Sequence, residues 1–96
     1  MACGKPVIAT ACTGHGDIIS ADNALAIATR GEVKSSSDGV ATATWPEPVL
    51  EEVIEKLEYA YQNRDALRPI AQRGAETMAK RTWQQTAEDF LELLSL

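Results

Sequence analysis

The hydrophobic residues at the start of the chain form two short apolar runs, each preceded by residues that favour turns. The first run covers residues 7–9. It follows Gly4, which suits the left-handed position at the end of a helix, and Pro6, which cannot continue one. The second run covers residues 24–28 and follows a turn signal at residues 22–23. Such runs are typical of strands covered on both faces of an α/β sheet, so the pattern predicts two short parallel strands.

The long polar segment that follows breaks this hydrophobic pattern. Residues 29–47 are polar and rich in Gly and Ser, and their few apolar residues have no regular spacing. Such a segment is expected to form a long loop without secondary structure of its own. We expect Trp45 to anchor the end of this loop on the core.

From residue 48 to residue 95 the apolar residues recur at helical spacing, which predicts three amphipathic helices. The polar side of the first helix is acidic, and we interpret it as a solvated face. The polar side of the second helix is basic, and we interpret it as charge balance against the first; its cations are Arg64, Arg68, Arg73, Lys80 and Arg81. Gly74 in the second stripe marks a close approach to a neighbouring element. The three apolar stripes consist of Leu50, Val53, Ile54, Leu57 and Tyr61, then of Leu67, Ile70, Ala71, Gly74 and Met78, and finally of Trp83, Ala87, Phe90, Leu91 and Leu94.

The starts of these helices are predicted from residues that favour helix termini. Pro48 suits the first turn of the first helix, which is expected to end near residues 62–63. The second helix begins between Asp65 and Arg68, because the proline that follows is tolerated only in a first turn. Thr82 and Gln85 have the spacing of a capping box, in which Thr82 caps the first turn and Gln85 reaches back. The third helix therefore begins at Thr82.

Together these elements predict an α/β fold in one small domain. Their order fits a partial Rossmann-like lobe, with two short parallel strands followed by three helices over residues 48–95. The 96 residues suffice for one domain and leave a large share of its surface exposed. Because Gly4 is expected to close a helix, and a domain rarely starts on a last helical turn, we expect the polypeptide to continue before Met1.

Charge and cysteine content narrow the class of partners. The net charge of −5 disfavours nucleic acid, because phosphate binding requires clustered Lys and Arg. Cys3 and Cys12 lack the spacing of a zinc or CxxC motif, so we interpret them as free thiols of a reducing cytoplasm, with a disulfide as the alternative. No apolar run approaches the roughly 20 residues that cross a bilayer. We therefore expect a cytoplasmic protein without a transmembrane segment, a metal or a cofactor.

The first strand and the residues before it resemble a known enzyme family. Residues 2–10, Ala-Cys-Gly-Lys-Pro-Val-Ile-Ala-Thr, resemble a segment of the donor-binding lobe of retaining, nucleotide-sugar-dependent glycosyltransferases of group 1, which have the GT-B fold of two Rossmann-like lobes. Residues 45–48, Trp-Pro-Glu-Pro, and residues 81–83, Arg-Thr-Trp, resemble motifs that precede later helices of that lobe. In such a lobe, stacking on a sugar is the alternative role of Trp45. In the family a pair of glutamates precedes the first segment, and this chain contains neither. The resemblance implies that residues 1–96 are the C-terminal part of such a lobe.

The loop after the first strand holds the candidate site, which consists of Thr13, Gly14, His15 and Gly16. Ligands bind at the carboxyl ends of strands in open α/β sheets, and the glycines allow the backbone to approach a ligand or simply to turn. The resemblance implies that this loop, followed by the acidic Asp17, lines the donor pocket. His15 invites an acid–base role, yet the sequence places no second titratable group beside it, so a solvated histidine is the simpler interpretation.

Two functions follow from these observations. The resemblance implies transfer of a sugar from a nucleotide-diphosphate sugar to an acceptor hydroxyl, with retention at the anomeric carbon. The chain contains no predicted catalytic residue and lacks both the glutamate pair and the acceptor lobe, so the isolated chain is expected to be inactive. The alternative is a non-catalytic α/β interaction module that forms a homo-oligomer through an exposed strand edge or its apolar helices.

Overall fold

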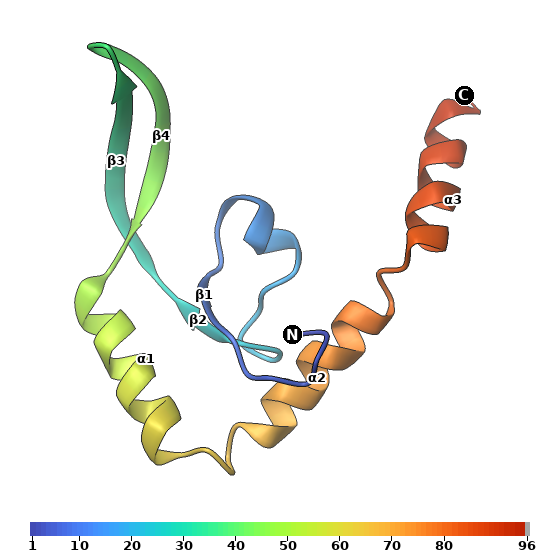
Figure 1. Cartoon of the computed structure of the whole chain (residues 1–96), viewed down its shortest axis with the longest axis horizontal. Helices are drawn as coiled ribbons and strands as arrows, with labels where there is room; N and C mark the ends of the chain where they lie inside the picture. Colours follow the sequence, from blue (N-terminus) through green and yellow to red (C-terminus); the bar gives the residue numbers. More distant parts are fainter. Residues whose placement is uncertain (96) are drawn as a thin grey trace.

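The computed structural model describes residues 1–95 of the chain and contains both strands and helices. The helices and strands are connected in an open arrangement, with β1 and β2 near the centre (Figure 1). In chain order they are β1 (Ile8–Thr10), the 3-10 helix η1 (Thr13–Asp17), β2 (Leu25–Ile27), β3 (Thr29–Ser37), β4 (Val40–Pro48), α1 (Leu50–Gln62), α2 (Arg68–Ala79) and α3 (Trp83–Leu94). The chain is therefore a mixed α/β structure with three helices and two small sheets.

The first sheet confirms the two predicted parallel strands. β1 pairs with β2 in parallel, with Ile8 opposite Leu25 and Thr10 opposite Ile27. Gly4 has a φ of 66° and its N–H donates to the carbonyl of Met1 at 2.9 Å, so the predicted left-handed position is present at the end of a turn. The strands are covered less than predicted, because all of β1 is only half-buried.

The second sheet corrects the prediction of a long loop over residues 29–47. β3 and β4 form an antiparallel hairpin, closed by Asp38 and Gly39 with φ angles of 53° and 78°. Such Asp-Gly turns match the twist of a hairpin. Every residue of β3 is exposed. A strand with solvent on both faces lacks the alternation that identifies strands in a sequence, so the pattern resembled a loop.

The hairpin also corrects the role expected for Trp45. Its side chain is 54% exposed, and the residue lies opposite Val33 in the hairpin register. Trp45 therefore does not anchor the segment on the core. A cross-strand pair of an aromatic and a β-branched residue stabilises a hairpin locally, which explains an apolar residue at this exposed position.

The small core lies between α2 and the loop that joins β1 to β2. Its buried apolar residues are Ile19, Ala24, Ile27, Leu67 and Ala71. Gly74 is buried in the same face of α2, and a side-chain carbon there would lie 3.0 Å from the carbonyl oxygen of Asn23. The predicted inner face of α2 and the close approach at Gly74 are thus confirmed.

Hydrogen bonds from α2 hold the same loop in place. The buried Asn23 side chain donates to the carbonyl of Ile18 at 2.8 Å and to the hydroxyl of Thr77 at 3.3 Å, and it accepts from the N–H of Ser20 at 2.9 Å. Arg73 donates to the carbonyl of Asp22. Buried polar groups stabilise a fold only when they are hydrogen-bonded, and these bonds satisfy both the NH₂ group and the oxygen of the Asn23 side-chain amide.

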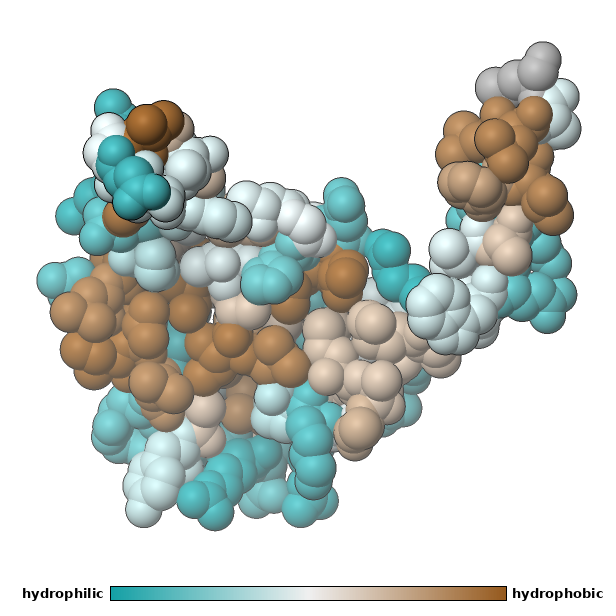
Figure 2. Space-filling view, turned by 45° about the horizontal axis from the view of Figure 1, so that its top comes forward, coloured by the Kyte–Doolittle hydropathy of each residue, from teal (hydrophilic) through white to brown (hydrophobic). Residues whose placement is uncertain are grey.

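The other two helices bury little of their apolar stripes. On α1, Leu50, Ile54 and Leu57 are 57–65% exposed, although the helix is tied to β2 by a hydrogen bond from the N–H of Ala28 to the Glu52 carboxylate at 3.1 Å. Every residue of α3 is exposed. Apolar surface accordingly gathers over α1 and again over α3 (Figure 2). The stripes predicted from the sequence exist, but within residues 1–95 only the stripe of α2 is largely covered.

The predicted helix starts are confirmed for α2 and α3 and differ slightly for α1. α2 begins at Arg68, the later of the two starts considered. The hydroxyl of Thr82 accepts from the N–H of Gln85 at 3.1 Å, which confirms the cap of α3. The Gln85 side chain does not reach back, because it donates instead to the carboxylate of Asp89 at 2.9 Å. α1 begins two residues after Pro48, at Leu50.

The molecule is thin and expanded for its length. Its Cα radius of gyration is 16.9 Å, whereas a compact domain of 96 residues has about 12.5 Å. Its extents are 48 × 46 × 17 Å, and α3 stands away from the other elements (Figure 1). Domains normally bury apolar faces between two or more layers, which this arrangement does only around α2. Among residues 1–95, every helix is too short or too polar to span a lipid bilayer.

Candidate functional site

The four predicted site residues lie together in η1, directly after the carboxyl end of β1 (Figure 1). The N–H of His15 donates to the carbonyl of Cys12 at 3.1 Å, and the carbonyl of His15 accepts from the N–H groups of Ile18 and Ile19. These bonds make a single tight turn rather than an extended loop. Thr13, Gly14, His15 and Gly16 are all exposed on it.

Thr13 has an unusual backbone conformation. Its φ is 52°, in the left-handed region that β-branched residues rarely occupy. A conformation of this kind costs of order 1–3 kcal/mol and is found most often at ligand-binding and switch positions. Within residues 1–95, the other non-glycine residue with a positive φ is Asp38, which the hairpin turn explains. The strain at Thr13 has no comparable structural explanation.

The two glycines of η1 are not required by the fold. A side-chain carbon added at Gly14 would meet no atom within 4 Å, and at Gly16 it would make an ordinary contact of 3.9 Å with the carbonyl of Ala11. Neither glycine has a positive φ. An alanine would therefore fit both positions, so the absence of side chains there leaves the backbone open to close approach from solvent.

A cationic side chain that the sequence analysis did not assign to the site lies at the end of η1. The guanidinium of Arg81 donates to the carbonyl of Asp17 at 2.6 Å. From the sequence, Arg81 is expected on the basic side of the second helix, but it lies two residues beyond the end of α2. Because 64 residues separate the two partners, no local sequence pattern could have indicated this contact. Arg81 adds positive charge next to the turn and joins it to the start of α3.

His15 remains a candidate without a partner for acid–base chemistry. Its ring makes no hydrogen bond to another side chain within the part of the chain that the structure describes. General acid–base catalysis requires a substrate or an orienting group within hydrogen-bond reach. Both roles considered for His15 stay predictions.

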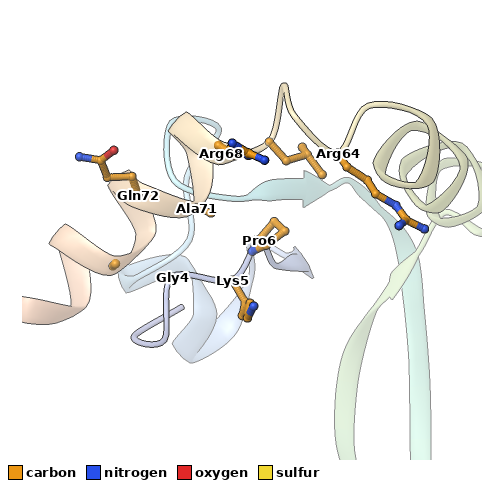
Figure 3. A pocket seen from close by; sticks show the side chains of 9 residues that line it. Gly4, Lys5, Pro6, Arg64, Arg68, Ala71 and Gln72 are labelled. Atoms are coloured by element: carbon orange, nitrogen blue, oxygen red, sulfur yellow. The ribbon is translucent and has the colours of Figure 1, made fainter.

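A groove of about 400 Å³ lies at the opposite, amino end of β1 (Figure 3). Its floor is apolar, and cationic side chains surround it. Arg64 is stacked on Tyr61 at 5.1 Å from the ring centroid, and Arg68 pairs with Asp65 at 3.1 Å. The floor of the groove is formed by Pro6, Leu67 and Ala71, and its rim by Lys5, Arg64 and Arg68. From the sequence, Arg64 and Arg68 are expected only to balance the charge of the acidic helix before them, and no sequence pattern indicated this groove.

The structure also locates the thiols and the metal-ligating residue types. Cys3 is exposed and Cys12 is half-buried, and both are unpaired. Within residues 1–95, no three His, Cys, Asp or Glu side chains are grouped closely enough to hold a metal ion.

Comparisons with protein-family models, with curated proteins and with solved structures find no match to this chain. The resemblance to glycosyltransferases therefore rests on the residues quoted above alone.

Proposed function

We propose that this chain contributes the turn Thr13–Gly16 to the nucleotide-sugar site of a Rossmann-like, donor-binding lobe in a retaining glycosyltransferase. The observation that carries the proposal is the strained turn at the carboxyl end of β1, a strand of a parallel pair. Ligands of open α/β sheets bind at this end of the strands. The strand is also the one whose sequence resembles the family segment.

The glycines support the same function. Since neither the space around Gly14 nor its φ requires a glycine, its place in the turn is best explained by a ligand that approaches the backbone. Sugar and phosphate oxygens make such approaches, because exposed backbone N–H groups donate hydrogen bonds to them and neutralise part of the charge of a phosphate. Thr13 adds a hydroxyl on the same exposed turn.

In such a reaction this chain would bind and orient the donor rather than break a bond. Retaining transfer requires stabilisation of the diphosphate as it leaves the anomeric carbon, and positioned backbone N–H groups supply part of that stabilisation. The pair of glutamates that the resemblance associates with the donor is not among the 96 residues. We therefore expect weak nucleotide binding and no sugar transfer by these residues alone.

An amide NMR titration with UDP and, separately, GDP tests the proposal. Resonances of residues 13–17 are expected to shift with one of the two nucleotides, which also identifies the base. In Gly14→Val the added side chain occupies the space a ligand would use, so binding should weaken by about tenfold while the spectrum stays dispersed. Ala21→Val, at an exposed loop position outside the turn, is the matched control. The absence of shifts at residues 13–17 with either nucleotide, or equal binding by Gly14→Val, would overturn the proposal.

A second function, the self-associating interaction module, is favoured by the exposed apolar stripes of α1 and α3. Apolar surface on this scale is rare on monomers and marks interaction sites. A molecular mass that rises with concentration, together with no nucleotide shift at residues 13–17, would support the module over the donor-binding turn.

A further inference from the structure

The chain exposes far more surface than a compact monomer of its mass. It exposes 7405 Å², whereas a compact monomer of 10.4 kDa exposes about 5,400 Å². If two copies each covered the excess of roughly 2,000 Å², the interface would bury roughly 4,000 Å² in total, which is typical of obligate dimers. A second copy of this chain therefore has enough surface to complete the structure.

Much of the exposed apolar surface belongs to α3, which stands apart from the other elements (Figures 1 and 2). Trp83 is 91% exposed, and Phe90, Leu91 and Leu94 on the same stripe are 61–67% exposed. An isolated helix of 12 residues is marginal in water, and most helices in proteins depend on packing of their apolar face. The apolar face of α3 therefore requires a surface to pack against.

The groove at the amino end of β1 offers such a surface. Pro6, Leu67 and Ala71 form its apolar floor, while Lys5 and Arg68 lie on different sides of it (Figure 3). An amphipathic helix that enters a groove places its apolar stripe on the floor and its flanking polar residues on the rim. The occupant of this groove should therefore be apolar along one face and acidic beside it.

The charges of α3 match this requirement. Residues 83–95 contain Glu88, Asp89 and Glu92 and no Lys or Arg. At about 100° per residue, the apolar face of α3 extends from Leu93 through Trp83 to Leu91, and Asp89 borders it beyond Leu93 while Glu88 borders it beyond Leu91. By contrast, α1 carries Glu51, Glu52, Glu55 and Glu58 around its stripe, so it would repel the acidic flanks of α3.

Contacts at the start of α3 direct the helix away from the groove of its own chain. Arg81 is held by the carbonyl of Asp17, and the next residue, Thr82, is extended and caps the helix. To reach its own groove, α3 would have to reverse across α2 within the three residues 80–82, and Arg81 would lose its bond to the carbonyl of Asp17. A groove on another copy requires no such reversal.

We propose that two copies of this chain form a closed dimer by exchange of α3, each α3 packing into the basic groove of the other copy. Each copy then gives and receives the same element, which closes the assembly at two chains. This proposal specifies how the second candidate function, the self-associating module, would form its homo-oligomer. It rests on that function only because both require self-association. Nucleotide binding at residues 13–16 is independent of it.

Sedimentation analysis of the full chain and of two charge-reversed variants tests the exchange. R64E/R68E makes the groove rim acidic, and E88K/D89K makes the flanks of α3 basic, so each variant alone should dimerise at least about tenfold more weakly than the wild-type chain. When the two variants are mixed, each α3 meets a groove of opposite charge, and dimers containing one chain of each are expected to form. Arg30→Glu, on the exposed hairpin, is the control that reverses a charge away from the groove and should leave dimerisation unchanged.

The outcomes separate the exchange from the functions proposed above. A wild-type dimer that is insensitive to both variants would overturn the exchange and leave self-association standing. A wild-type chain that stays monomeric would overturn both, and variants that form no mixed dimers would show that α3 does not pack into the groove of another copy. The nucleotide titration remains a separate measurement, since neither variant changes residues 13–16.

Discussion

The helices α2 and α3 have the same length and a similar pattern of apolar residues, yet they differ completely in burial. Each has 12 residues and one apolar stripe. In α2 the stripe covers the loop between β1 and β2, and Ala71 is 5% exposed. In α3 every residue is exposed, and Trp83 at its start is 91% exposed.

The difference comes from the surface that the rest of the chain offers to each helix. The stripe of α2 contains Gly74, where a side-chain carbon would lie only 3.0 Å from the carbonyl oxygen of Asn23, so the missing side chain allows the loop to pack closely on the helix. Asn23 and Arg73 then add hydrogen bonds across the same interface. α3 meets no comparable surface within residues 1–95. An amphipathic pattern thus indicates which face of a helix can be buried, but not whether the chain supplies the surface that buries it.

The test with the largest expected effect replaces one leucine by alanine at each helix. Leu67, at the start of α2, is 3% exposed, and Leu93 on α3 is 68% exposed. Leu67→Ala should lower the free energy of unfolding by about 2–5 kcal/mol, because it removes buried contacts and leaves a cavity. Leu93→Ala should change it by less than about 0.5 kcal/mol. Urea unfolding at low protein concentration measures both, and equal losses would contradict the assignment of the core to α2.

The close approach at Gly74 can be blocked directly. Gly74→Val adds atoms where even one carbon would lie 3.0 Å from the carbonyl of Asn23, so α2 must move away from the loop. The expected loss is about 1–3 kcal/mol of unfolding free energy. Ala79→Val, at the exposed end of the same helix, measures the effect of a valine on the helix alone. If the two variants unfolded at the same urea concentration, the packing described at Gly74 would be wrong.

The cap of α3 provides the smallest test. Without packing in the monomer, α3 depends on its local bonds, among which the hydroxyl of Thr82 satisfies the N–H of Gln85. Thr82→Ala should destabilise the helix by about 1 kcal/mol and reduce the helical circular dichroism signal of the monomer. Thr86→Ala removes a hydroxyl that bonds only the carbonyl of Thr82 and is the control. Amide hydrogen exchange of Thr82→Ala locates the effect. If exchange became faster in α2 rather than in α3, the cap would stabilise the rest of the fold instead of α3.

Much of the local structure could be predicted from the sequence. The left-handed Gly4, the two apolar strands, the start of α2 within its predicted range and the cap at Thr82 all follow from a few adjacent residues. The hairpin of residues 29–48 was missed although Asp38-Gly39 is a strong hairpin signal. Both faces of its strands are exposed to solvent, so the strands lack the alternation of apolar and polar residues. The Asp-Gly turn signal therefore occurs without the strand pattern that normally accompanies it.

The candidate site was predicted in part. The sequence placed Thr13, Gly14, His15 and Gly16 after the first strand, and the structure brings them into one exposed turn there. The left-handed φ of Thr13 was not predictable, because threonine itself disfavours it and the surrounding structure must impose it. The contact of Arg81 with this turn was also missed.

The sequence by itself determined the turn at Gly4, where α2 and α3 begin and which face of each helix is apolar. These properties depend on residues within a few positions of one another. The tertiary structure alone decided that α2 is buried while α3 is exposed, that Arg81 reaches Asp17, and that Lys5, Arg64 and Arg68 surround one groove. The physical reason is that burial and charge clustering depend on which surfaces meet, and those surfaces come from segments that lie far apart in the chain.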